Sequence, residues 1–157
     1  MTDVDRGYVL PPGGTLLGQS VNEHMRVLVG GEQSLGAYAL LAYTLDHDAV
    51  PHVHEREDES VFVLEGEITL HLGPDEHDLG PGGFAFMPRG VPHAITRRTP
   101  TWRGFSVSAP GGVFDNIIRD RNEARAAGEQ LDEEAVWRIR ERYGMRRVKN
   151  LAEGIQR

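Results

Sequence analysis

Between residues 8 and 108, apolar residues come in short runs, and clusters of the turn-forming residues Gly and Pro separate these runs. The runs rich in β-branched, aromatic and aliphatic residues, which we predict to be strands, are 25–29, 38–45, 60–64, 68–72, 84–87 and 102–107. Parallel strands would need helical crossovers, and no helical period separates these runs. The sequence therefore predicts an all-β fold, an antiparallel barrel or sandwich.

After the last predicted strand, the apolar period becomes helical. Residues 113–119 carry apolar side chains three and four positions apart and predict a short helix, whereas residues 120–130 are polar and predict a loop. Asp132 is a suitable N-cap for a second helix that runs to Tyr143, and Gly144 would end it. The apolar stripe of this helix either packs against the barrel or covers its mouth as a lid, and the sequence leaves both alternatives open.

A chain of 157 residues fits one domain of ordinary size, and its 39% of hydrophobic residues suffice for a core. We predict a β-barrel domain with N-terminal strands over residues 1–110. Residues 111–157 are predicted to form a C-terminal helical extension that packs on the barrel.

The composition narrows the classes of function. With 17 basic and 24 acidic residues the net charge is −7, which argues against nucleic acid as a partner. The chain has no cysteine, so disulfides and cysteine-ligated zinc or iron–sulfur sites are excluded. Neither a targeting signal nor an apolar segment near the roughly 20 residues of a membrane helix is visible, so we expect a cytoplasmic protein with no membrane partner.

Two histidines and a glutamate have the arrangement of metal ligands. His52 and His54 share one face of an extended segment, because side chains alternate along a strand. Glu59 follows across a short turn and shares a strand face with Val61 and Val63. A carboxylate on an apolar face is costly to bury unless it is paired or bound to a cation. A metal ion beside Glu59 would remove that cost.

A third imidazole comes from His93, which follows a Pro/Gly turn and begins another strand. Three neutral imidazoles and one carboxylate suit first-row transition metals in five- or six-coordination. Four protein ligands would leave positions open for water, dioxygen or a chelating substrate, unlike a closed structural zinc site. This ligand set accepts iron, manganese, nickel, cobalt, copper and zinc, so the sequence leaves the identity of the metal open.

These residues have the spacing of a known family. The segment His52-x-His54-x4-Glu59-x6-Gly66 resembles the first motif of the cupin superfamily, and Gly82-x5-Pro88-x-Gly90-x2-His93 resembles the second. With one pair of motifs, the chain resembles a monocupin. Residues 61–66 (VFVLEG) and 108–114 (SAPGGVF) are similar to the quercetin 2,3-dioxygenase-like members.

The resemblance implies an antiparallel jelly-roll barrel in which His52, His54, Glu59 and His93 point inward onto one divalent transition metal ion per chain. It also implies a homodimer, and a dioxygenase acting on a small oxygen-rich substrate such as a flavonol or a related enol. Glu59 would have a second role as the catalytic base, which requires apolar surroundings to raise its pKa.

Two alternative functions use the same fold. The first is a non-oxidative metal-dependent cupin enzyme, namely an isomerase, cyclase, decarboxylase or lyase of a biosynthetic pathway. The second is a cupin that binds a small molecule without catalysis. A strict requirement for dioxygen would distinguish the dioxygenase from both.

A few further side chains are candidates for the barrel interior. Tyr38 and Tyr43 have opposite parity in one strand, so at most one of them faces the cavity. Phe84 and Phe86 share a face, and we expect them to fill the core. Arg97 either points inward to meet an anionic substrate or lies exposed at the end of its strand.

Overall fold

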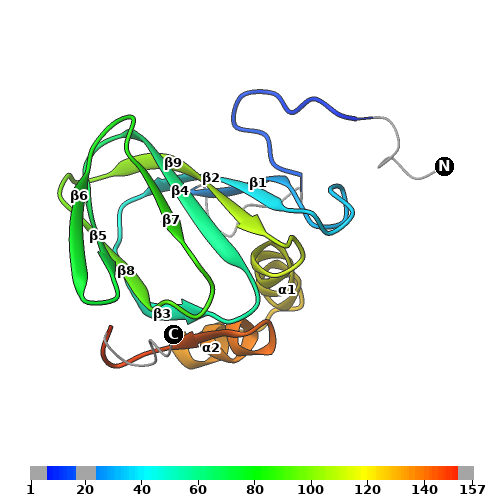
Figure 1. The fold of residues 1–157 in the computed structure, drawn as a ribbon. Helices are drawn as coiled ribbons and strands as arrows, with labels where there is room; N and C mark the ends of the chain where they lie inside the picture. Colours follow the sequence, from blue (N-terminus) through cyan, green and yellow to red (C-terminus); the bar gives the residue numbers. More distant parts are fainter. Residues whose placement is uncertain (1–6, 17–23, 152–157) are drawn as a thin grey trace.

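Figure 1 shows the fold, a computed structural model that describes residues 7–16 and 24–151. In these ranges the strands are β1 (Met25–Val29), β2 (Ala39–Leu45), β3 (Ala49–His54), β4 (Asp58–Glu65), β5 (Ile68–Leu72), β6 (Asp75–Leu79), β7 (Phe84–Met87), β8 (His93–Arg97), β9 (Trp102–Ala109) and β10 (Met145–Arg147). The helices are α1 (Phe114–Ala126) and α2 (Glu133–Arg142). Every strand predicted from the apolar runs is present, so the β-rich prediction is confirmed.

The described strands form two antiparallel five-stranded sheets. One sheet has the order β1-β2-β9-β4-β7, and the other has the order β10-β3-β8-β5-β6. From β2 to β9 the chain passes back and forth between the two sheets, a connectivity typical of the jelly roll. Figure 1 shows the two sheets facing each other, with the core between them.

Strict alternation of side chains builds this core. Along β9, every second residue from Trp102 to Ser108 is buried and the residues between them are exposed. Leu41 of β2 and Val63 of β4 are completely buried beside Trp102. Burying an aliphatic side chain such as Leu41 contributes about 1.5–3 kcal/mol. The packed core therefore fixes the positions of the side chains that point between the two sheets.

Two aromatic side chains depart from the prediction. Phe84 and Phe86 are 60% and 53% exposed, so the expectation that they fill the core is wrong. They lie on β7, which is an edge strand of its sheet. The register of β7 turns Met87 inward instead, and Met87 is 1% exposed.

Helix α1 is longer than predicted. The predicted helix ends at residue 119 and a loop follows, whereas α1 continues to Ala126. Its polar last turns have partners in the folded chain: Asp120 accepts a hydrogen bond from the Tyr143 hydroxyl at 2.7 Å, and Asn122 is buried. Asp120 and Asn122 are polar because they meet other protein groups, so the loop prediction is wrong for residues 120–126 and is confirmed for residues 127–130.

Both helices lie at one end of the sheets (Figure 1). Helix α2 begins at its predicted N-cap, where Asp132 accepts a hydrogen bond from the Ala135 N–H at 2.7 Å. A second apolar cluster joins the helices to β10, and it consists of Val113, Ile117, Trp137, Ile139 and Met145. The apolar stripe of α2 therefore packs against protein. Within the described ranges, neither helix is long and apolar enough to cross a lipid bilayer.

Two strands have no apolar run to reveal them. Strand β6 is almost entirely polar and exposed. Strand β10 is short and pairs with β3, so that Met145 lies opposite His54 and Arg147 opposite His52. The C-terminal extension thus adds a strand beside the strand that carries two predicted metal ligands. The division of the chain at residue 110 remains a prediction.

Candidate metal centre

Three neighbouring strands carry the four predicted ligands. His52 and His54 lie at the end of β3, and His93 begins β8 directly opposite His52 in the antiparallel register. Glu59 is the second residue of β4, in the facing sheet. The turn between His54 and β4 brings the chain from one sheet to the other. As a result, the two cupin-like motifs meet between the sheets.

The ligand atoms of these four residues converge. One ligand atom from each of His52, His54, Glu59 and His93 lies within 4.8 Å of all the others. The Nε2 atoms of His52 and His54 are 3.1 Å apart. A Glu59 carboxylate oxygen, Oε2, lies 3.5 Å from His54 Nε2 and 3.6 Å from His93 Nε2. Two ligand atoms that each lie about 2.1 Å from one ion are roughly 3.0 Å apart at a right angle and 3.4 Å apart at a tetrahedral angle. The observed spacings are close to these values.

The hydrogen bonds of Nδ1 fix the tautomers of His52 and His93. His52 Nδ1–H donates to the Val50 carbonyl oxygen at 2.7 Å, and His93 Nδ1–H donates to the Val91 carbonyl oxygen at 3.1 Å. A carbonyl can only accept, so in the neutral imidazoles Nε2 carries the lone pair. His93 Nε2 is buried and has no hydrogen-bond partner in the described part of the chain. Lone pairs gathered in this way beside a carboxylate fit a cation.

Glu57 orients the third imidazole, a role that the sequence did not reveal. His54 Nδ1–H donates to Glu57 Oε1 at 2.8 Å, and the Glu57 side chain is 0% exposed. A carboxylate that accepts from the far nitrogen of a ligating histidine is the usual second partner in metal sites. Glu57 lies in the charge-rich segment 55–59, which as a pattern is typical of a solvated loop. Only the burial of its side chain in the folded protein distinguishes Glu57 from the solvated acidic residues around it.

The pKa values of His52 and Glu59 are both lower than their ordinary values. Burial and the neighbouring imidazoles of His93 and His54 hold the pKa of His52 well below its ordinary value. Burial alone would raise the pKa of Glu59, but the nearby imidazoles of His93, His54 and His52 outweigh burial and lower this pKa to about 2. Glu59 is therefore an ionised carboxylate, the form in which it can accept a proton, and the expectation that its surroundings raise its pKa is wrong.

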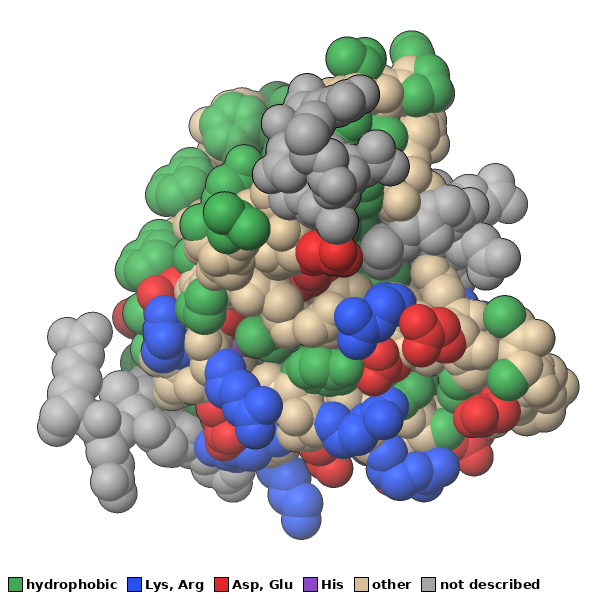
Figure 2. Space-filling model, turned by 90° about the vertical axis from the view of Figure 1, so that its right-hand side faces the viewer, with side chains coloured by type: hydrophobic (Ala, Val, Ile, Leu, Met, Phe, Trp, Pro, Cys, Tyr) green, Lys and Arg blue, Asp and Glu red, His purple; other side chains and the backbone are tan. Residues whose placement is uncertain are grey.

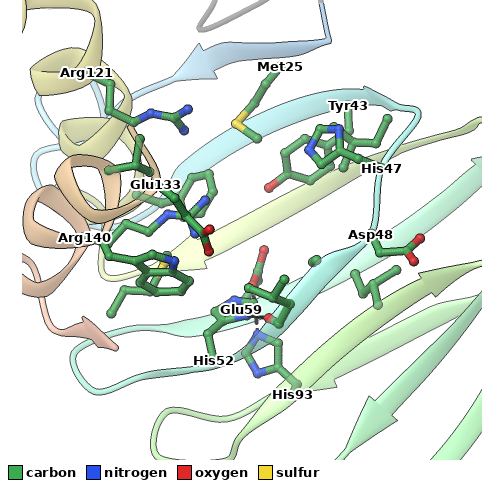
Figure 3. Close-up of a pocket in the computed structure, with 18 of the residues that line it drawn as sticks. Met25, Tyr43, His47, Asp48, His52, Glu59, His93, Arg121, Glu133 and Arg140 are labelled. Atoms are coloured by element: carbon green, nitrogen blue, oxygen red, sulfur yellow. Dashed lines mark hydrogen bonds and ion pairs between the residues drawn. The ribbon is translucent and has the colours of Figure 1, made fainter. Parts of the chain in front are cut away.

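A cavity of about 360 Å³ opens beside the ligand group (Figure 3). His52, Glu59 and His93 line one part of it, and apolar barrel residues line another. Of the two tyrosines compared above, Tyr43 lines the cavity and donates to or accepts from Ser106 Oγ at 2.5 Å, whereas Tyr38 is 40% exposed. Burial and the charge of Glu59 raise the pKa of Tyr43 well above its ordinary value, so its hydroxyl keeps its proton.

Arg97 does not enter this cavity. Its Nε lies 3.1 Å from the Asp48 carboxylate, and the pair sits where β8 ends. Ile95, two residues earlier on the same strand, does line the cavity. The inward alternative for Arg97 is therefore wrong, since Arg97 does not line the cavity and its side chain pairs with Asp48 where the strand ends.

Comparison with known proteins agrees with this arrangement. Residues 43–101 match the family described as the cupin domain. Quercetin 2,3-dioxygenase of Bacillus subtilis (strain 168) is 34% identical over 67 residues, which make up 42% of this chain and 20% of that enzyme. The match thus spans about a fifth of the length of this relative.

Solved structures share the fold. KdgF from Halomonas sp. superposes with a TM-score of 0.51 at 20% identity, over 59% of this chain and 84% of KdgF. The cupin domain of Cnp3 from Schizosaccharomyces pombe superposes with a TM-score of 0.50 at 15% identity, over 68% of this chain and 72% of that domain. Both ligand motifs and the match to the cupin domain family lie on the same strands of the two-sheet fold, so residues 43–101 of this chain resemble a cupin domain.

Proposed function

We propose that this cupin-like domain is a metal-dependent dioxygenase that acts on a small oxygen-rich substrate, a flavonol or a related enol. The convergence of His52, His54, Glu59 and His93 at the wall of a cavity is the observation that carries the proposal. The similarity to a quercetin 2,3-dioxygenase over 67 residues supports the oxidative chemistry.

The four side chains would hold one divalent transition metal ion, which supplies Lewis-acid polarisation of a substrate oxygen when it is bound. The chain itself orients and encloses the substrate. Apolar side chains such as Val61 and Ile95 line the cavity and keep water away from a flat ring. The Tyr43 hydroxyl, which stays protonated, can donate a hydrogen bond to a substrate oxygen, and the ionised Glu59 can accept the proton of a substrate hydroxyl.

The test begins with elemental mass spectrometry of untagged protein purified without chelators or added metal. We expect about one redox-active or nickel ion per chain, and oxygen uptake when flavonols and other enols are supplied. Turnover that persists without dioxygen would favour the non-oxidative alternative, an isomerase, cyclase, decarboxylase or lyase. A site that neither holds nor accepts a metal would contradict the proposal.

Glu59→Gln is expected to keep much of the bound metal and to lose turnover. The amide oxygen can still occupy the ligand position, but the neutral amide cannot accept a proton from the substrate. Metal content and oxygen uptake, measured on the same preparation, separate the two effects. Full turnover by this variant would exclude Glu59 as the base.

A homodimer remains our prediction, and we assign it to one apolar face. This face lies on the outer side of β4, β7 and β9 and consists of the exposed residues Phe62, Phe84, Phe86, Phe105 and Val107. Phe62 pairs with Phe84 on one side and with Phe105 on the other, so the face is continuous. Contiguous exposed aromatic surface marks an interaction site, and a second copy presents a surface of the same chemistry.

Phe86→Glu is expected to convert the dimer into a monomer, because a two-fold contact would bring two carboxylates into one apolar interface. Light scattering coupled to size-exclusion chromatography measures the mass. His77→Glu, on the exposed strand β6 of the other sheet, is the control and should leave the mass unchanged. A wild-type chain that is monomeric at micromolar concentration would overturn this assignment.

A further inference from the structure

The helices contribute three arginines, namely Arg121, Arg125 and Arg140, to the cavity that holds the predicted metal ligands. Arg121 comes from α1 and Arg140 from α2, and both line the same cavity as His52, Glu59 and His93. Figure 3 shows the Arg121 and Arg140 side chains reaching from the helices into this space, across from the strands that carry the ligand group. The cavity therefore has a metal-binding part on the strands and a cationic part on the helices.

In the described ranges of the chain, neither Arg121 nor Arg140 forms a close ion pair with a carboxylate. Arg121 Nε and Arg140 Nε are buried and have no hydrogen-bond partner among the described residues. The charges that act most on Arg121 come from two other arginines, and with burial they lower its pKa to about 10. A buried cation without a partner is costly, and two facing cations add repulsion.

The acidic residues that line the cavity are engaged with other groups. Asp48 pairs with Arg97 at 3.1 Å, and the Asp132 carboxylate caps α2. Glu133 attracts Arg140 but is 74% exposed, and it pairs with Arg147 at 3.3 Å. Among the described residues, none of these three carboxylates therefore forms a close ion pair with Arg121 or Arg140.

Stacking holds Arg140 in position. Its guanidinium carbon lies 4.4 Å from the centre of the Trp137 ring, and Arg147 stacks on the same ring at 4.9 Å. Trp137 is itself 3% exposed and belongs to the apolar cluster between the helices. A guanidinium fixed over an aromatic ring loses little further freedom when it binds an anion, and its planar fork matches an oxyanion.

We propose that Arg121 and Arg140 form an oxyanion subsite, so that the substrate of this cavity carries a carboxylate or phosphate group in addition to the oxygens that face His52, Glu59 and His93. This inference rests on the proposed metal site, because it names the far end of the molecule that this site would bind. Figure 2 shows Lys and Arg side chains, interspersed with acidic ones, over the lower part of the molecular face where α2 and β10 lie.

The experiment compares two matched probes by calorimetry on the zinc-loaded protein. The probes are 2-oxo diacids with two to four methylene groups before the distal carboxylate, and the distal methyl esters of the same acids. Each pair shares a metal-chelating end and differs only in the distal charge. We expect the diacid of best length to bind about 10- to 100-fold more tightly than its ester, as for hydrogen bonds to charged groups.

Arg121→Gln and Arg140→Gln should each reduce this preference to near unity and leave the affinity for the ester unchanged. Arg138→Gln is the matched control, because Arg138 is exposed on α2 and does not line this cavity. Arg140→Lys keeps the charge and should retain part of the preference for the diacid over its ester. This variant allows the same comparison if a glutamine variant folds poorly. Equal binding of diacid and ester by the zinc-loaded wild type would overturn the subsite and leave the metal site standing.

A second measurement separates the subsite from the metal and identifies the oxyanion. Metal-free protein is titrated with inorganic phosphate and with acetate, and tryptophan fluorescence is followed because Trp137 lies under Arg140. Saturable binding that Arg140→Gln removes supports the subsite, and the tighter of the two anions gives the chemical class. If zinc does not load but this binding is present, the proposed function fails and the subsite remains. If the protein binds neither anion and none of the diacids, the proposed oxyanion subsite is overturned.

Discussion

His93→Ala is expected to abolish stoichiometric metal binding while the barrel stays folded. His93 supplies one of the converging ligand atoms, and its Nε2 is buried without any other partner within the described residues. The other ring nitrogen bonds only a backbone carbonyl two residues away, so the substitution costs some packing of a buried ring but leaves no other side chain without its hydrogen bond. Elemental mass spectrometry measures the metal, and circular dichroism with thermal melting measures the fold.

His77→Ala serves as the matched control for this variant, because His77 is exposed on β6 and lies outside the ligand group. It should keep the wild-type metal content. His54→Ala should behave like His93→Ala, since its Nε2 faces the same point. Full metal occupancy in both His54→Ala and His93→Ala would contradict the assignment of the site.

Glu57→Ala is expected to weaken metal binding by about 10- to 100-fold, although Glu57 is not a ligand. The substitution removes the acceptor that fixes the His54 ring, so that Nε2 is no longer held toward the other ligand atoms. Glu57→Gln keeps an acceptor oxygen and should lose less, because it removes the charge but not the orientation. Competition with a chromophoric chelator measures the affinity of each variant.

The control for Glu57 is its neighbour Glu55, an exposed carboxylate that pairs with Arg146 at 2.7 Å on the surface. Glu55→Ala removes the same chemical group from the same turn and should leave the metal affinity unchanged. Equal affinities of the Glu57→Ala and Glu55→Ala proteins would show that Glu57 has no positioning role.

The ligand set could be predicted from the sequence because it depends on local geometry. Alternation along a strand places His52 and His54 on one face, and turn residues place His93 at the start of its strand. The spacing of the motifs then resembles one family, whose fold brings the strands together. The β-rich architecture followed for a similar reason, since short apolar runs and Gly/Pro turns act within a few residues.

Predictions failed where a residue's environment depends on distant parts of the chain. Phe84 and Phe86 share a face as predicted, but only the pairing of β7 at a sheet edge decides that this face is outside. The last turns of α1 are polar, and only the contact between Asp120 and Tyr143 shows why they stay helical. Polarity alone does not distinguish a solvated residue from one that bonds to protein.

By itself, the sequence determined the strands that carry apolar runs, the turns and the N-cap of α2, because each of these follows from backbone geometry over a few residues. The resemblance of its motifs to one family indicated the four side chains that converge. The tertiary structure alone decided that Glu57 is buried against His54, that Tyr43 lines the cavity, and that Arg121 and Arg140 enter it from the helices. The physical reason is burial: a charged side chain has the same local sequence signature in water and in a cavity, and long-range packing selects between them.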